Sequence, residues 1–370
     1  MFYLAGIFIA CFSSFLILGK KQKTSADYIL ALWFWIIGIN TIYFLLIFSG
    51  EYVRFPFFLG LEIPLPLLHG PMLYLYVRDL TGQSKKGYTW ILHFLPPILI
   101  YIILIPFFCL TSEEKKIVYE NGGSSYKYLR RDIGILIIIS GIFYVLASFI
   151  SVKKYKKEIA QRYSNTDKIN LNWLNYLIIG ISLIWVAVLL KNDIAIFTMV
   201  VVFILLASYF GISKVGILNS KDITVANVEN ETNREPMSDP VIVKYQKSNA
   251  SDESIKNVYQ KLLSKIDNDK VFKDPELTLN NLAIILDVHP NLLSQTINQM
   301  ENKNFYDYIN RQRIEEFKRI ALLPENQKYT ILSLAFESGF NSKTSFNRNF
   351  KKYMDCSPRE FLKSQNISLE

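Results

Sequence analysis

The side chains best suited to chemistry lie near the carboxyl end of the chain, on one side of a short predicted helix. Arginine and asparagine can each form two hydrogen bonds with a base edge, and lysine can hold a phosphate. Residues 343–363 include six basic and two acidic residues, so this patch is positively charged. The chemistry it offers is nucleic-acid recognition, and the alternative is a solvated, charged helix face. The outward polar positions are Lys343, Thr344, Asn347, Arg348, Lys351 and Lys352.

A second candidate site lies inside the apolar stretch 55–76, where Glu62 and His69 accompany four prolines and two glycines. Ionisable groups inside a bilayer are costly and usually face a partner or a cavity, and the prolines must break or kink a helix. One hypothesis is a ligand or proton site built around Glu62 and His69. The alternative is a kinked or re-entrant helix whose Glu and His are satisfied by neighbouring spans.

Catalytic and metal-binding signatures are missing from the sequence. It contains no HExxH, GxSxG or P-loop motif, and the part after residue 213 has no Gly-rich nucleotide-binding sequence. The cysteines (Cys11, Cys109 and Cys356) are far apart, and the three histidines are scattered, so no disulfide framework or metal set is indicated. We therefore expect no enzyme, no catalytic residue, no metal and no cofactor.

The polar patch must be positioned by short helices, because residues 279–298 and 330–353 repeat one plan. Each has an apolar first helix with a small residue (Ala283 or Ala335), then a tight turn, then a second helix that is polar outside. Phe346 and Phe350, four residues apart, bury one side of the last helix. Both segments are therefore predicted to be helix-turn-helix units, whose second helix can enter a DNA major groove.

Residues 251–267 precede these units and place six apolar residues at helical spacing. The stripe they form is predicted to pack either on its own domain or on a second copy of the chain. Before it, residues 214–250 are polar and lack apolar periodicity, which is typical of a flexible linker. The domains expected are thus 1–213, a linker over 214–250, and a helical domain over 251–366.

The composition is split in the same place. The 370 residues are 51% hydrophobic with a net charge of +9, but residues 1–213 carry 19 Lys and Arg against 11 Asp and Glu, whereas residues 214–370 carry 22 against 21. The first part is membrane-like and the second has an ordinary soluble composition. This split excludes one uniform globular domain. Since the first part holds most of the positive excess, net charge is not evidence for DNA binding.

Seven apolar stretches in residues 1–213 have lengths suited to crossing a bilayer, which predicts an all-α fold: a seven-span bundle followed by the helical domain. Loops one, three and five carry twelve Lys and Arg, against seven in the other loops. This bias predicts an outside N-terminus and a cytoplasmic C-terminal domain. The predicted spans are Phe2–Gly19, Tyr28–Phe48, Phe55–Tyr76, Tyr88–Leu110, Asp132–Ser151, Trp173–Leu190 and Asp193–Ile212.

Several motifs occur in order in the last third of the chain: LTLNNLA, LLSQTIN, NFYDYIN, then Arg313, LAFESGF, SFNRNFKKY and SPREF. They resemble the DNA-binding domain of the AraC/XylS family of transcription regulators. With the preceding spans, the chain is similar to the membrane-anchored members of that family. The resemblance implies a seven-helix domain with two helix-turn-helix units, whose second helices enter successive segments of the major groove.

The resemblance also implies base-facing residues: Asn291 and Gln295 on the first recognition helix, and Lys343, Thr344, Asn347 and Arg348 on the second. The chain departs from the family pattern in four places. His289 and Pro290 stand where a Ser-led helix start is common, Phe317 where a small residue is usual, and Asp355 where Gly is usual. The first recognition helix also has no Arg or Lys.

The leading hypothesis is a membrane-tethered, sequence-specific transcription regulator in the inner membrane of a bacterium, with the spans as signal sensor. The alternative is a membrane receptor or transporter whose helical domain binds protein partners. The leading hypothesis implies as partners double-stranded promoter DNA, the lipid bilayer, RNA polymerase, a second copy of the chain, and an unidentified small-molecule or membrane signal.

Overall fold

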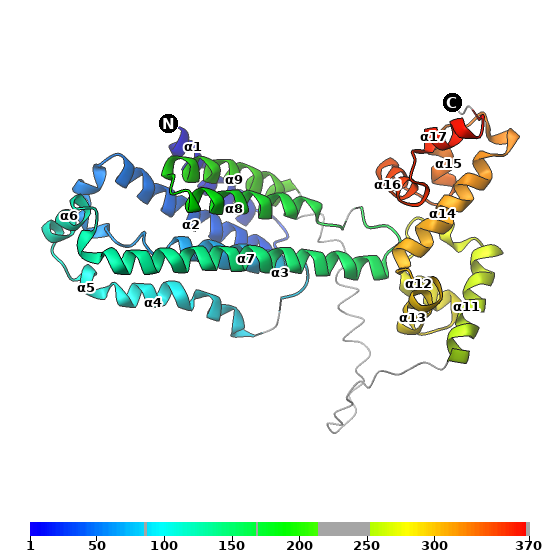
Figure 1. Cartoon of the computed structure of the whole chain (residues 1–370), viewed down its shortest axis with the longest axis horizontal. Coiled ribbons are helices and arrows are strands. Elements are labelled where there is room, and N and C mark those ends of the chain that lie inside the picture. Colours follow the sequence, from blue (N-terminus) through cyan, green and yellow to red (C-terminus); the bar gives the residue numbers. More distant parts are fainter. Residues whose placement is uncertain (85–86, 168, 214–251, 368–370) are drawn as a thin grey trace, which may run out of the picture. The chain divides into compact units, whose positions relative to one another are not determined.

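The computed structural model describes residues 1–84, 87–167, 169–213 and 252–367. These residues are helical and contain no β-strand, which confirms the predicted all-α class (Figure 1). The chain divides into two compact units. The first comprises residues 1–154 and 171–235, and the second comprises residues 155–170 and 236–370. The predicted linker, residues 214–250, lies outside the described residues.

The first unit is built from long apolar helices and short 3-10 turns. Four helices are long and apolar enough to cross a membrane: α2, α7, α8 and α9. The α-helices of this part of the chain are α1 (Phe2–Leu18), α2 (Ser25–Phe48), α3 (Pro66–Leu80), α4 (Leu95–Ile103), α5 (Ile105–Phe108), α6 (Ser112–Glu120), α7 (Lys127–Arg162), α8 (Asn172–Leu189) and α9 (Asp193–Ser213).

The prediction of seven spans is not confirmed. The third predicted span is broken, because residues 56–65 form 3-10 and other turns and the helix begins only at Pro66. The fourth is divided into a 3-10 segment, Tyr88–Phe94, and the short helices α4 and α5. Prolines near the start of each short helix explain the breaks, since proline lacks the N–H that would continue the preceding turn. The first helix, α1, has 17 residues.

Small residues let the helices of this unit approach closely. A Cβ added to Gly141 would lie 2.3 Å from the Trp185 ring, and one added to Gly211 would lie 2.4 Å from Leu30. Close packing through small residues is typical of helices in lipid, where the hydrophobic driving force between helices is weak. Lys20 adds a polar tie, because its Nζ contacts Asp27 at 2.6 Å and donates to the Gly211 carbonyl at 2.8 Å.

The second unit holds seven α-helices between residues 252 and 367, the number that the resemblance implied. Two short 3-10 turns, Val271–Lys273 (η6) and Pro324–Asn326 (η7), join some of them. The helices are α11 (Asp252–Asp267), α12 (Leu279–Leu286), α13 (Pro290–Glu301), α14 (Phe305–Ala321), α15 (Ile331–Glu337), α16 (Lys343–Met354) and α17 (Pro358–Ser364).

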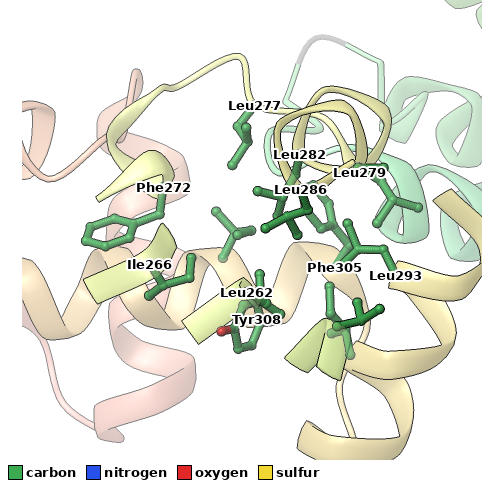
Figure 2. Packing of buried hydrophobic residues seen from close by; sticks show 14 residues of the cluster. Leu262, Ile266, Phe272, Leu277, Leu279, Leu282, Leu286, Leu293, Phe305 and Tyr308 are labelled. Carbon is green, nitrogen blue, oxygen red and sulfur yellow. The ribbon is translucent and has the colours of Figure 1, made fainter. Parts of the chain in front are cut away.

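Two separate cores hold these helices. In the first, α11, α12 and α13 gather over the start of α14, with Leu262, Leu282, Leu293 and Tyr308 packed together (Figure 2). The apolar stripe of α11 is buried there, so it packs on its own unit. The second core gathers α15, α16 and α17 around the other half of α14, and its buried members include Phe317, which is fully enclosed. Helix α14 therefore links the two cores.

Local capping fixes where the recognition helices start. The Ser342 Oγ accepts a hydrogen bond from the Ser345 amide at 3.1 Å and caps α16, a position for which serine is among the preferred residues. The His289 Nδ1 does the same for α13, accepting from the Asn291 amide at 3.2 Å. His289 thus substitutes chemically for the Ser that the family commonly uses, and Pro290 follows at the first helical position.

Candidate nucleic-acid interface

Helix α16 separates its polar and apolar sides cleanly. Ser345, Phe346, Asn349 and Phe350 are buried against the second core. All six residues predicted to face outward are exposed: Lys343, Thr344, Asn347, Arg348, Lys351 and Lys352. Within the part of the chain that the structure describes, Lys343, Thr344 and Asn347 form no side-chain hydrogen bond or ion pair, so they are available to a partner.

Helix α13 offers a different surface. Asn291 is exposed at its first turn and Gln295 is half-buried one turn later. Both carry amides, and α13 has no Lys or Arg. The first recognition helix can therefore offer hydrogen bonds to base edges, while the cationic contacts with phosphate must come from α16 and its surroundings.

Two cations of α16 are held by residues that sequence reasoning did not single out. The Arg348 Nη2 donates to the Tyr306 hydroxyl at 2.9 Å and to the Asp167 Oδ1 at 3.1 Å. The Lys352 Nζ lies 2.6 Å from the Asp307 Oδ1. Tyr306 and Asp307 belong to α14, so the linking helix orients two of the six outward side chains.

Asp167 belongs to residues 155–170, which form part of the second unit. This segment pairs with the chain just before α12. The Ser164 amide and hydroxyl both donate to the Leu277 carbonyl, at 3.3 and 2.6 Å, and Tyr163 forms an isolated antiparallel bridge with Thr278. The Asn310 Nδ2 in α14 donates to the Ser164 carbonyl at 2.8 Å. Ser164 is 1% exposed, so it anchors the segment inside the unit.

Arg313 is the centre of this network. Only 1% of its surface is exposed, and its guanidinium donates to the carbonyls of Phe272 (2.7 Å) and Asp274 (2.6 Å) and to the Ser164 Oγ (3.0 Å). Burial lowers the pKa of Arg313 to about 10, so it stays charged at neutral pH. The motif comparison picked out Arg313, but its position shows a structural role that joins α14, the loop before α12 and the 155–170 segment.

Glu316, one turn further along α14, holds three cations. Its carboxylate lies 2.8 Å from the Arg319 Nε, 3.0 Å from the Lys270 Nζ and 3.2 Å from the Lys273 Nζ. Hydrogen bonding from Arg319, then from Lys270 and Lys273, lowers the pKa of Glu316 to about 2. The loop that follows α11 is thereby fixed to the linking helix.

In the first unit, the structure separates Glu62 from His69. The Glu62 carboxylate accepts hydrogen bonds from the Tyr119 hydroxyl and from the Gly60 amide, the latter at 2.9 Å. Because the chain is not helical between Glu62 and Pro66, the two residues share no helix face. His69 instead contacts the Trp33 Nε1 at 3.2 Å and the Asn40 amide at 3.1 Å.

His69 also lines a cavity of about 360 Å³ bounded by α2, α3, α7, α8 and α9, and Glu62 is not among its lining residues. Apolar side chains dominate the wall, and the polar groups include Asn40, His69, Lys191 and Asp193. Pockets for small molecules have this character, with a few polar groups that orient a mostly apolar ligand.

Comparison with known families identifies the type of domain that the last six helices form. A family model described as a helix-turn-helix domain, of the AraC type, matches residues 282–364. The match covers α13 to α17 and most of α12. No curated protein and no solved structure is found to match the chain.

Proposed function

We propose that this DNA-binding transcription regulator works while tethered to a membrane and reads promoter DNA sequence-specifically. The match of residues 282–364 to an AraC-type helix-turn-helix family model supports the proposal. The observation that carries the proposal is the exposed polar face of α16 in a chain whose described residues include four helices long and apolar enough to cross a bilayer.

The proposed contacts are supported by the exposed polar side chains of the two helices. Asn291 and Gln295 offer amides to base edges from α13. From α16, Lys343, Thr344 and Asn347 offer ammonium, hydroxyl and amide groups to base edges, and Arg348 reaches either a base edge or a neighbouring phosphate. Lys351 and Lys352, further along the helix, hold phosphates.

The organisation of the second unit supports the proposed topology. The 155–170 segment and residues 252–367 must lie on one side of the membrane, because Ser164 bonds to Leu277. Two long apolar helices, α8 and α9, separate them in sequence, and an even number of crossings returns the chain to the same side. The bias of Lys and Arg places that side in the cytoplasm of a bacterium.

The helices before α7 keep the N-terminus outside. In the proposed topology, α1, a shorter apolar helix of 17 residues, and α2 count as two crossings. Helix α3 and the α4–α5 segment form a pair, and such a pair returns the chain to its starting side whether or not it crosses. With α7, α8 and α9 the number of crossings is then odd, so the two ends of the chain lie on opposite sides of the inner membrane.

The first unit would sense the signal through the cavity beside His69. The wall chemistry fits a mostly apolar small molecule with a hydrogen-bonding group that reaches His69 and Asn40. His69→Ala should then reduce the response of a reporter promoter to the native stimulus. Glu62→Gln, which alters an acidic group outside the cavity wall, should leave the response nearly unchanged. An equal loss in both variants would argue against the cavity.

The second unit also has an apolar surface for protein partners. Ile284 and Ile285 on α12 are 77% and 46% exposed. We propose this pair on α12 as the contact surface for RNA polymerase or for a second copy of the chain.

The decisive experiment is genome-wide mapping of the sites occupied by the intact, membrane-bound protein. We expect a recurrent DNA motif, and the absence of any enriched motif would overturn the proposal. On the motif so found, Arg348→Ala should weaken specific binding by about 1–3 kcal/mol if Arg348 contacts a base edge. An equal loss on scrambled DNA would make Arg348 a phosphate contact instead.

A further inference from the structure

The amino end of α16 carries an anion site that is already occupied by the chain itself. We infer that the Asp167 carboxylate stands where a phosphate of bound DNA would otherwise be held, so that the 155–170 segment competes with DNA for the second recognition helix. This inference rests on the proposed function, since it assumes that α16 contacts DNA.

Three independent groups converge on the Asp167 carboxylate. The Ser342 hydroxyl, at the cap of α16, donates to its Oδ2. The Arg348 Nη2, from the second turn of the same helix, donates to its Oδ1 at 3.1 Å. The twelve-residue α16 adds the partial positive charge of its amino end. A hydroxyl, a guanidinium and a helix amino end together are a typical binding site for a phosphate oxygen.

The carboxylate is fixed in this position. Three residues before Asp167, Ser164 is buried and bonded to the Leu277 carbonyl and to Arg313. Within the segment, the Asp167 amide donates to the Asn165 Oδ1 at 3.1 Å. The side chain of Asp167 is 21% exposed and that of Arg348 is 44% exposed, so the ion pair lies at the surface, where DNA can reach and displace it.

A phosphate and the Asp167 carboxylate cannot share the site, because both are anions and need the same donors. While the pair is closed, Arg348 is held toward Asp167, and the carboxylate repels any approaching phosphate. DNA binding must therefore break the Asp167 contacts with Ser342 and Arg348. The free energy needed to break them is lost from the affinity of the protein for DNA.

The segment is also well placed to report on the first unit. It directly continues α7, a single helix of 36 residues that ends at Arg162, and it leads into α8 at Asn172. A change in either helix alters the path of the chain through Ser164 and Asp167. A signal that loosens this path would raise the affinity for DNA without touching the recognition helices.

The test uses the full chain reconstituted in lipid nanodiscs and the DNA motif obtained by genome mapping. Asp167→Asn keeps the size of the side chain but removes its charge, and we expect it to bind the motif about tenfold more tightly, within the range usual for coupled sites. Glu276→Gln is the matched control, because Glu276 is also an exposed acid near α16 and accepts from the Asn341 amide at 3.2 Å. It should change the affinity less than twofold.

A double-mutant cycle identifies the route of the effect. If Asp167 acts by blocking Arg348, the gain from Asp167→Asn should shrink to a small fraction when Arg348 is already Ala. Unchanged affinity in Asp167→Asn, or an equal gain in Glu276→Gln, would overturn the inference. Lack of preference for the motif in the wild type and in Asp167→Asn alike would instead be a failure of the proposed function.

Discussion

The two helix-turn-helix units follow one plan but differ in how they meet their surroundings. The first recognition helix, α13, carries amides and no cation, and its preceding turn uses Asp287 in the left-handed region, with φ 53°. The second, α16, carries four exposed cations, and its turn uses Gly339 with φ 97°. Only the second is contacted by Asp167.

This difference in side chains suits the two helix-turn-helix units to separate tasks. Amides can distinguish bases but cannot neutralise phosphates, while Lys and Arg supply most of the affinity for a polyanion. The first helix-turn-helix unit is therefore suited to selecting the DNA sequence, and the second helix-turn-helix unit to holding the duplex. A contact that controls affinity, such as that of Asp167, is most effective on the second unit.

The largest effect is expected from Arg313, whose loss should destabilise both helix-turn-helix units. Arg313→Ala leaves the carbonyls of Phe272 and Asp274 and the Ser164 hydroxyl without their buried donor, and we expect a loss of about 3–5 kcal/mol. Hydrogen exchange should then accelerate in both α13 and α16, because Arg313 lies on α14, the helix that links the two helix-turn-helix units. Arg311→Ala is the control: Arg311 is on the same helix but 47% exposed, and we expect a loss below about 0.5 kcal/mol. Faster exchange in one unit only would contradict a joint role.

Acid should loosen the attachment of the loop after α11 to α14. The pKa of Glu316 is lowered to about 2 in the folded chain, against an ordinary value near 4.5, so the unfolded state binds its proton first as the pH falls. The stabilisation of about 2–3 kcal/mol is complete above roughly pH 5 and is lost as the pH falls toward 2. Glu316→Gln should lack this part of the pH dependence. Identical acid-unfolding profiles for the two proteins would refute the assignment.

The two turns should respond in opposite directions to substitution. Gly339→Ala strains a φ of 97° and brings a Cβ to 2.6 Å from the Phe272 carbonyl oxygen, so we expect destabilisation of about 1–3 kcal/mol. Asp287→Gly relieves a left-handed residue and should stabilise by up to about 1 kcal/mol. Exchange rates of the α15–α16 and α12–α13 amides measure each change locally. A change in stability of the same sign in both variants would contradict the different backbone requirements of the two turns.

The smallest expected effects distinguish a cation on α16 from an amide on α13 directly. Lys351→Ala on α16 removes a cation assigned to phosphate, so it should weaken binding to every DNA sequence and reduce the magnitude of the slope of log K against log salt by about 1. Gln295→Ala on α13 should weaken binding only to the preferred motif and leave the slope unchanged. Equal salt slopes in the two variants would show that α16 and α13 do not differ in their contacts with phosphate.

The helical domain was largely predictable from sequence, because its information is local. The four-residue spacing of Phe346 and Phe350, the cap at Ser342 and the turn at Gly339 each act within a few residues. Asp355 also takes the left-handed conformation, with φ 55°, although Gly is usual there in the family. Asp tolerates this region better than most residues, so the departure does not change the fold.

The remaining features depend on contacts that no local pattern contains. Asp167 and Arg348 are 181 residues apart in sequence, and nothing in the polar stretch around Asp167 indicates a partner on α16. The cavity beside His69 likewise depends on five helices meeting. Glu62 and His69 were paired in the sequence-based hypothesis because they share one apolar stretch, and the proline-induced break between them separates their environments.

The burial of Ser164 has a consequence for proteolytic activation. A protease that cuts the chain between residues 214 and 251 would sever the covalent connection between α9 and α11. The carboxyl-terminal fragment would nevertheless stay attached, because Ser164 and Asp167 would keep their hydrogen bonds to Leu277, Arg313 and Arg348. Release of the fragment would therefore require two events, the cut and the loss of these contacts, and a nicked protein would be recovered with its two pieces still associated.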